Sequence, residues 1–151
     1  MNLLFVEDDE DKANKIIIEL EGKHPEVTLL RARSFTSALQ MLVKRKNEIA
    51  GIVLDMSMPN YDNSLEAPEH FAGRDLLKQC KLRKIEKPTV VVTMLDRFGS
   101  GSAQLTLEQL DRQLEEEFCP AYLGVVYFSS TQEAWKSQLS GFVTKIMESA
   151  K

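Results

Sequence analysis

The sequence predicts an α/β protein built on a doubly wound, five-stranded parallel sheet. Short apolar runs, rich in branched and aromatic residues, alternate with segments in which apolar residues recur at helical spacing. Within the runs successive residues are apolar, which is typical of parallel strands buried on both faces. The predicted strands are 3–6, 27–30, 51–54, 89–94 and 123–128.

A helix is predicted after each strand, because apolar residues recur at three- and four-residue spacing and give each helix one apolar stripe. The stripes are Ala13, Ile16, Ile17 and Leu20; Phe35, Ala38, Leu39 and Leu42; Leu76, Leu77 and Cys80; Leu107, Leu110 and Leu114; and Trp135, Leu139, Phe142, Val143 and Ile146. Ser34 is the expected cap of the second helix. Capping boxes are expected at Thr106 with Gln109 and at Ser130 with Glu133.

The length and charge of the chain exclude several classes of protein. At 151 residues the chain fits one domain, 1–151, and leaves no room for a separate output domain. The formal charge of −4, with dispersed basic residues, argues against nucleic-acid binding. No apolar stretch could span a membrane and no charged leader opens the chain, so we expect a cytoplasmic protein. Cys80 and Cys119 are expected to be reduced structural thiols.

Acidic residues stand where two predicted strands end. Asp55 closes the run 51–54, and Glu7 and Asp8 follow the run 3–6. If the two strands are neighbours, the carboxylates come together, and such clusters need a cation for neutralisation. Hard oxygen ligands with open positions suit Mg²⁺. A carboxylate beside a bound metal can attack a phosphoryl group.

These motifs resemble the receiver domain of bacterial two-component response regulators. The matching segments are Val6-Glu7-Asp8-Asp9, Leu54-Asp55-Met56-Ser57-Met58-Pro59 and Pro88-Thr89-Val90-Val91-Val92-Thr93, and the resemblance covers most of the chain. It implies a flavodoxin-like receiver fold with strand order 2-1-3-4-5. Ligands in such sheets bind at the carboxyl ends of the strands, beside the point where the order reverses.

The resemblance also implies roles for individual residues. Asp55 would accept a phosphoryl group from a histidine kinase, a phosphotransfer protein or a small phosphodonor. Asp8 would bind Mg²⁺ directly, Glu7 would hold a metal-bound water, and the backbone carbonyl of Ser57 would complete the protein ligands. Thr93 would donate its hydroxyl to the phosphoryl group, and Tyr127 would act as a switch residue.

Each role has a structural alternative. Asp55 could be a turn or cap residue, Thr93 a simple strand residue, and Tyr127 a core residue with a solvated hydroxyl. Asp9, together with Glu10 and Asp11, is expected in the first turn of the first helix, where acidic residues complement the helix dipole.

The chain departs from the receiver pattern at the end of the last strand. Receivers carry a Lys there that contacts the phosphoryl group, whereas this chain aligns Ser130 at that position. Lys136 and Lys145 fall in the last helix and cannot take its place. The absence of this lysine leaves three outcomes: slower phosphotransfer, a substitute cation such as Arg74 or Arg97 from the long loops, or no phosphorylation at all.

Two further departures lie near the expected site. Met94 follows Thr93 where the family has a small residue, which would narrow access to an acylphosphate. The connections 60–72 and 96–103 are unusually long, and the first glycine after Met58-Pro59 is Gly73, which indicates an insertion at the mouth of the site. His24 and His70 are expected at the surface.

Two functions remain open. One is a stand-alone receiver, not an enzyme although it would catalyse its own Mg²⁺-dependent phosphorylation and dephosphorylation. It would signal to a downstream protein effector, and form a homodimer, through the fourth helix, last strand and last helix. The other is a pseudo-receiver that binds its partner without phosphorylation. A haloacid-dehalogenase-type phosphatase is disfavoured, because it needs a second Asp where this chain has Ser57.

Overall fold

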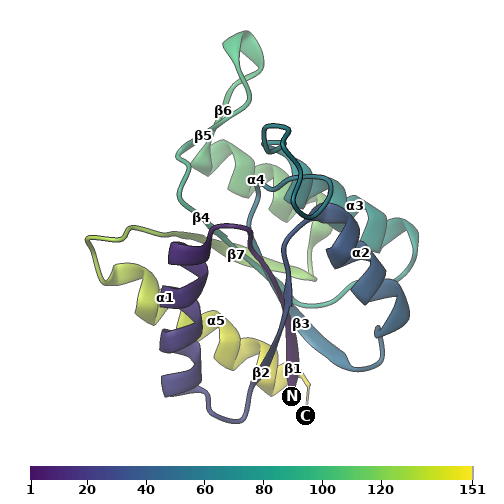
Figure 1. Ribbon diagram of the computed structural model, residues 1–151, viewed down its shortest axis with the longest axis vertical. Helices are drawn as coiled ribbons and strands as arrows, with labels where there is room; N and C mark the ends of the chain where they lie inside the picture. The colour runs from purple at the N-terminus through teal and green to yellow at the C-terminus, as the bar shows by residue number, and fades with distance from the viewer. Residues whose placement is uncertain (151) are drawn as a thin grey trace.

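Five parallel strands form the central sheet of the computed structural model, which describes residues 1–150 (Figure 1). They are β1 (Asn2–Val6), β2 (Thr28–Ala32), β3 (Ile49–Leu54), β4 (Thr89–Thr93) and β7 (Tyr122–Tyr127). Their order is β2-β1-β3-β4-β7. The predicted doubly wound order 2-1-3-4-5 is therefore confirmed, with β7 as the fifth strand of the sheet.

Helices cover both faces of this sheet. They are α1 (Glu10–Lys23), α2 (Phe35–Lys44), α3 (Ala72–Leu82), α4 (Leu107–Phe118) and α5 (Ala134–Ser149). One apolar cluster joins the sheet to α1 and α5, and a second joins it to α2, α3 and α4. The predicted apolar stripes form these clusters, because their helical spacing turns one side of each helix toward the strands.

The helix caps agree with the sequence at two of three positions. Ser34 accepts the backbone N–H of Ser37, and Thr106 accepts that of Gln109, so both predicted caps are confirmed. The predicted capping box of Ser130 with Glu133 is wrong. Glu133 itself occupies the N-cap of α5 without a side-chain hydrogen bond, because Ser129 and Thr131 bond to each other and hold the preceding residues in a turn.

Both long connections carry structure that the sequence did not predict. A short antiparallel hairpin, β5 (Arg97–Phe98) and β6 (Leu105–Thr106), surrounds the 3-10 turn η1 (Gly101–Ala103) and extends beyond the expected loop 96–103. The inserted loop before α3 is closed by reciprocal backbone hydrogen bonds between Met58 and Glu69. Hairpin and inserted loop rise from the same end of the molecule (Figure 1).

Two expectations for individual residues, His24 and Asp9, need correction. His24 is buried, not at the surface, because it caps the end of α1 against α5, where its Nε2 lies 2.8 Å from Ser140 Oγ. Cys80 and Cys119 are both free thiols, of which Cys80 is buried and Cys119 is exposed. Asp9 precedes the first turn of α1 and caps it. Among residues 1–150, no helix has the length and apolar character needed to cross a membrane.

Candidate functional site

Three acidic side chains meet at the carboxyl edge of the sheet. β1 and β3 are neighbours in parallel register, with Val6 opposite Leu54, so the residues that follow them emerge together. The backbone N–H of Asp55 donates to Val6 O at 3.0 Å and fixes this alignment. Carboxylate oxygens of Glu7, Asp8 and Asp55 all lie within 4.8 Å of one another. The three acidic residues predicted from the strand ends are thus brought into one site.

Burial makes the negative charge of this cluster costly. Burial, reinforced by the carboxylate of Asp55, raises the pKa of Glu7 to about 8, against the opposing effect of Lys12. Burial is also the main cause of a raised pKa at Asp55, and at Asp8, where Asp55 adds repulsion. A hard divalent cation would relieve this repulsion, so the oxygen donor set fits Mg²⁺.

A lysine that sequence reasoning missed lies inside the cluster. Only 1% of the Lys12 side chain is exposed, and its Nζ is 2.6 Å from Glu7 Oε1 and 3.4 Å from Asp55 Oδ2. Its third partner is the backbone carbonyl of Val92, at 2.8 Å. The sequence did indicate that Lys12 is buried, because it lies one turn before Ile16 and two turns before Leu20 on the buried stripe of α1.

Hydrogen bonds and close backbone packing hold the acidic residues in place. Arg31 donates from Nε and Nη2 to the carbonyl of Glu7, at 2.8 and 2.6 Å. Backbone N–H groups of Ser57 and Met56 donate to the Asp55 carboxylate and oppose the rise in its pKa. Gly73, in the first turn of α3, lies so close to the end of β3 that an added Cβ would be 2.6 Å from Asp55 O.

The predicted switch residues lie at the ends of the adjoining strands. Thr93 is fully buried at the end of β4, and its Oγ1 accepts the backbone N–H of Leu95 at 3.1 Å. Tyr127 pairs with Thr93 in the sheet register and is 46% exposed, so the alternative of a core tyrosine is wrong. Lys12, Met94 and Ser130 line one hollow of about 520 Å³ beside these strand ends.

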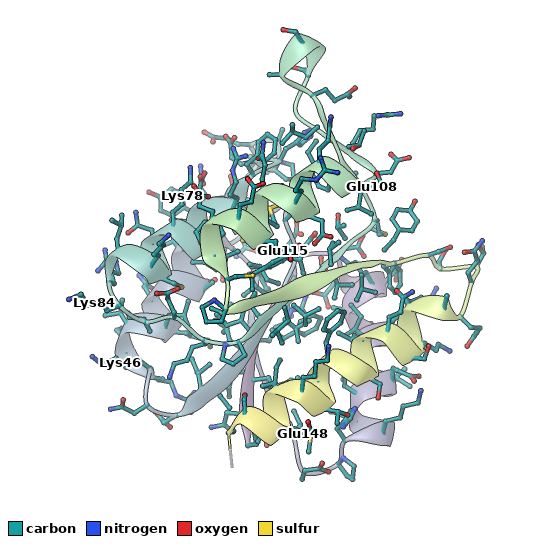
Figure 2. The ribbon with its side chains drawn as sticks, turned by 180° about the vertical axis from the view of Figure 1, so that it is seen from behind. Lys46, Lys78, Lys84, Glu108, Glu115 and Glu148 are labelled. Carbon is teal, nitrogen blue, oxygen red and sulfur yellow. The ribbon has the colours of Figure 1, made fainter. Side chains whose placement is uncertain are left out.

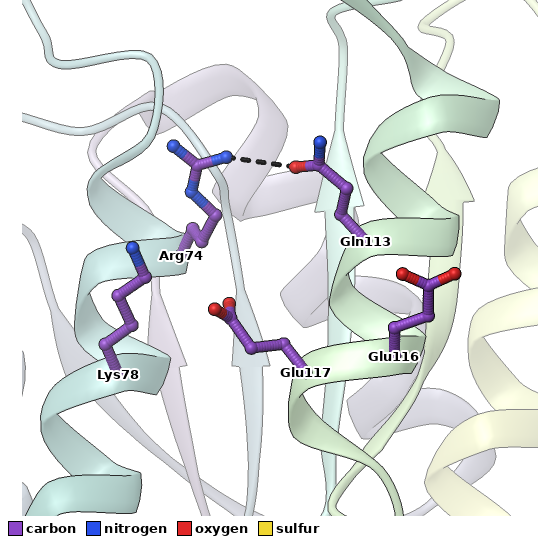
Figure 3. A pocket seen from close by; sticks show the side chains of 5 residues that line it. All are labelled: Arg74, Lys78, Gln113, Glu116 and Glu117. Carbon is purple, nitrogen blue, oxygen red and sulfur yellow. Dashed lines mark hydrogen bonds between the residues drawn. The ribbon is translucent and has the colours of Figure 1, made fainter.

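The predicted substitute cations are engaged elsewhere. Arg74 donates to Gln113 Oε1 at 3.2 Å and stacks over Phe71, so it spans α3 and α4 rather than facing Asp55 (Figure 3). Arg97 is an exposed residue of the hairpin strand β5. Lys12 is the only basic side chain paired with Asp55 among residues 1–150.

Comparisons with known proteins identify the fold. No protein family model matches the sequence. The Detocs response regulatory protein DtcB of Enterobacter cloacae is 28% identical over 152 residues, covering 97% of this chain and 100% of that protein. An uncharacterized protein of Sinorhizobium fredii, y4jR, is 26% identical over 144 residues, covering 92% and 94%.

The receiver domain of Francisella response regulator 1452 is similar in structure to this chain. It has a TM-score of 0.67 and 21% sequence identity, and covers 99% of this chain and 98% of that one. The chain therefore has the fold of response regulator receiver domains, and the resemblance carried by its motifs is confirmed.

Proposed function

We propose that this chain is a stand-alone receiver that accepts a phosphoryl group on Asp55 from a histidine kinase or a phosphotransfer protein. The observation that carries the proposal is the position of the Asp55 carboxylate, at a strand end and within 4.8 Å of the Glu7 and Asp8 carboxylates. The similarity to a protein described as a response regulatory protein supports the same function. The chain would not be an enzyme acting on a separate substrate, although it would catalyse its own modification.

The chemistry assigned to Asp55 is a phosphoryl transfer. One carboxylate oxygen attacks phosphorus, and the donor leaves with the electron pair of the broken bond. The hydroxyl of Thr93 accepts a backbone N–H, so its own proton is free to donate to a phosphoryl oxygen. Tyr127, which pairs with Thr93 in the sheet, would transmit the change to the surface of β7.

The proposed phosphoryl transfer would use a metal ion bound beside Asp55. The carboxylates of Asp8 and Asp55, the backbone carbonyl of Ser57 and, through water, Glu7 would hold Mg²⁺. When bound, it would offset the negative charge of the phosphoryl oxygens. The carboxylate cluster supports this assignment, because burial and the nearby Asp55 carboxylate raise the pKa of both Glu7 and Asp8.

Signalling would proceed through protein contacts in the cytoplasm. In Figure 2, β7 lies between α4 and α5, and Glu108 and Glu115 on α4 and Glu148 on α5 project from this face. We assign it to contacts with a downstream protein effector and to homodimer formation. Its acidic side chains favour a partner surface that carries basic residues.

The proposal is tested by intact mass measurement after incubation with Mg²⁺ and acetyl phosphate or phosphoramidate. We expect a gain of one phosphoryl group that requires both Mg²⁺ and Asp55. Asp55→Asn should abolish it, while Asp62→Asn, at an exposed position in the inserted loop, should not. No gain with either donor, and no Mg²⁺ binding by calorimetry, would sink the proposal and favour the pseudo-receiver.

A further inference from the structure

We propose that Lys12 is the cation that binds the phosphoryl group on Asp55, supplied from α1 instead of from the end of the last strand. This inference rests on the proposed phosphoacceptor function of Asp55. Its basis is the ammonium of Lys12, which lies 3.4 Å from Asp55 Oδ2 and touches the ends of three neighbouring strands through Glu7, Asp55 and Val92.

The site is built around this ammonium. A buried lysine without partners costs several kcal/mol, so burial of the charge requires acceptors for its N–H groups. Lys12 has three donors, and the Glu7 carboxylate, the Asp55 carboxylate and the Val92 carbonyl lie around them. The burial of Lys12 is therefore compensated by the groups that would surround a phosphorylated Asp55.

The hollow lined by both Lys12 and Ser130 explains how a cation at either position could bind the phosphoryl group. Lys12 and Ser130 line the same hollow, together with Met94 and Phe128. A lysine at position 130 would enter this hollow from the segment after β7, whereas Lys12 enters it from the first turn of α1. Ser130 can therefore be neutral without leaving the site uncharged.

Before transfer, the ammonium of Lys12 is shared by two carboxylates. A phosphoryl group on Asp55 brings further negative charge beside Lys12. Acetyl phosphate would lose its bond between phosphorus and the acetate oxygen, Asp55 would gain the phosphorus–oxygen bond, and acetate would leave with the electron pair. Lys12 would keep its place beside Asp55 and move its strongest contact from Glu7 to a phosphoryl oxygen.

The same geometry predicts two effects of opposite sign. Lys12 attracts the phosphoryl group but repels a metal ion, because both cations share Glu7 and Asp55. Removal of its charge should slow phosphorylation while leaving Mg²⁺ binding intact or tighter. A lysine that only held the site in shape would, when removed, weaken both together.

The test compares Lys12→Met with wild type and with Lys15→Met, an exposed position that lines the same hollow. Phosphorylation by acetyl phosphate is followed by intact mass, and Mg²⁺ affinity by calorimetry. We expect Lys12→Met to react more slowly, on the order of tenfold to a hundredfold, with Mg²⁺ affinity equal to wild type or higher. Lys15→Met should behave as wild type.

A wild-type rate for Lys12→Met, or a slow rate together with lost Mg²⁺ binding, would overturn the inference while leaving Asp55 as phosphoacceptor. If wild type itself gains no phosphoryl group, the proposed function fails and this inference with it. If circular dichroism shows Lys12→Met unfolded, Lys12→Gln is judged by the same criteria. It keeps N–H donors for Glu7 and Val92 but removes the charge.

Discussion

His70, in the inserted loop, accepts the backbone N–H of Gly99 through its Nδ1, at a distance of 3.0 Å. The neighbouring rings of Phe71 and Phe98 lie 6.3 Å apart between centroids. Two segments far apart in sequence, the inserted loop and the hairpin β5–β6, are thereby joined at the edge of the sheet that carries Asp55. Each segment stabilises the other.

Replacing His70 should loosen the hairpin. In His70→Ala the Gly99 N–H loses its acceptor, so peptides covering 97–106 should exchange amide hydrogen faster, with a global stability change under about 1 kcal/mol because the bond is exposed. Hydrogen exchange with mass spectrometry measures this, with Asp62→Ala as control. Unchanged exchange in these peptides would show that the Phe71–Phe98 contact alone holds the hairpin.

Gly73 should tolerate no side chain. A Cβ there would lie 2.6 Å from Asp55 O and 2.9 Å from Met56 Cα, both backbone atoms that cannot move without displacing the site. We expect Gly73→Ala to lower the free energy of unfolding by about 1–3 kcal/mol or more and to weaken phosphorylation of Asp55. Urea denaturation measures the first effect and intact mass the second.

Gly141, within α5, is the matched control, because an added Cβ there meets no atom within 4 Å. Gly141→Ala should raise stability by roughly 0.4–1 kcal/mol, since alanine loses less backbone entropy in a helix. Equal destabilisation by both substitutions would mean that the close approach of α3 to β3 is not what Gly73 provides.

The strands and apolar stripes were predictable, because the period of buried residues reports directly on secondary structure. The same holds for the carboxylate cluster. Glu7, Asp8 and Asp55 each follow an apolar run, and the strand order implied by the motifs makes those runs neighbours. Local patterns predicted the elements, and the receiver resemblance supplied the strand order that brings the carboxylates together.

The partners of Lys12 and the hairpin β5–β6 were not predicted, because both depend on contacts between distant segments. Lys12 bonds to Val92, which is 80 residues away. The hairpin strands span two residues each, too few for an alternating pattern to be visible. His24 was misjudged for the same reason, since its partner Ser140 lies on another helix.

The two cysteines should differ sharply in reactivity. Burial, with a contribution from Glu86, raises the pKa of the Cys80 thiol to about 11, whereas Cys119 is exposed. Since the thiolate is the nucleophile, iodoacetamide at neutral pH should modify Cys119 at least about tenfold faster than Cys80. Peptide mapping over time distinguishes them, and in denaturant the difference should shrink. Equal rates in the folded protein would contradict the burial of Cys80.

The ionisation of Tyr122 should make the free energy of unfolding depend on pH in the alkaline range. Its hydroxyl donates to Asp111 Oδ1 at 2.5 Å, and burial, reinforced by this bond, raises its pKa above the ordinary value of 10.0. A folded-state pKa above the unfolded one means that the folded protein keeps a proton which the unfolded chain loses. The stabilisation from Tyr122 is therefore complete below about pH 10 and declines as the pH rises further.

Tyr122→Phe removes both the hydrogen bond and this linkage. At neutral pH it should cost about 1 kcal/mol, mostly because Asp111 loses its donor. Above about pH 10 wild type should lose stability more steeply than the variant, so the difference between them narrows. Urea denaturation across this range, with tyrosinate absorbance recorded in parallel, measures both slopes. Equal slopes for the two proteins, or ionisation of Tyr122 at its ordinary pKa of 10.0 in the folded protein, would show that the hydrogen bond to Asp111 does not raise the pKa of Tyr122.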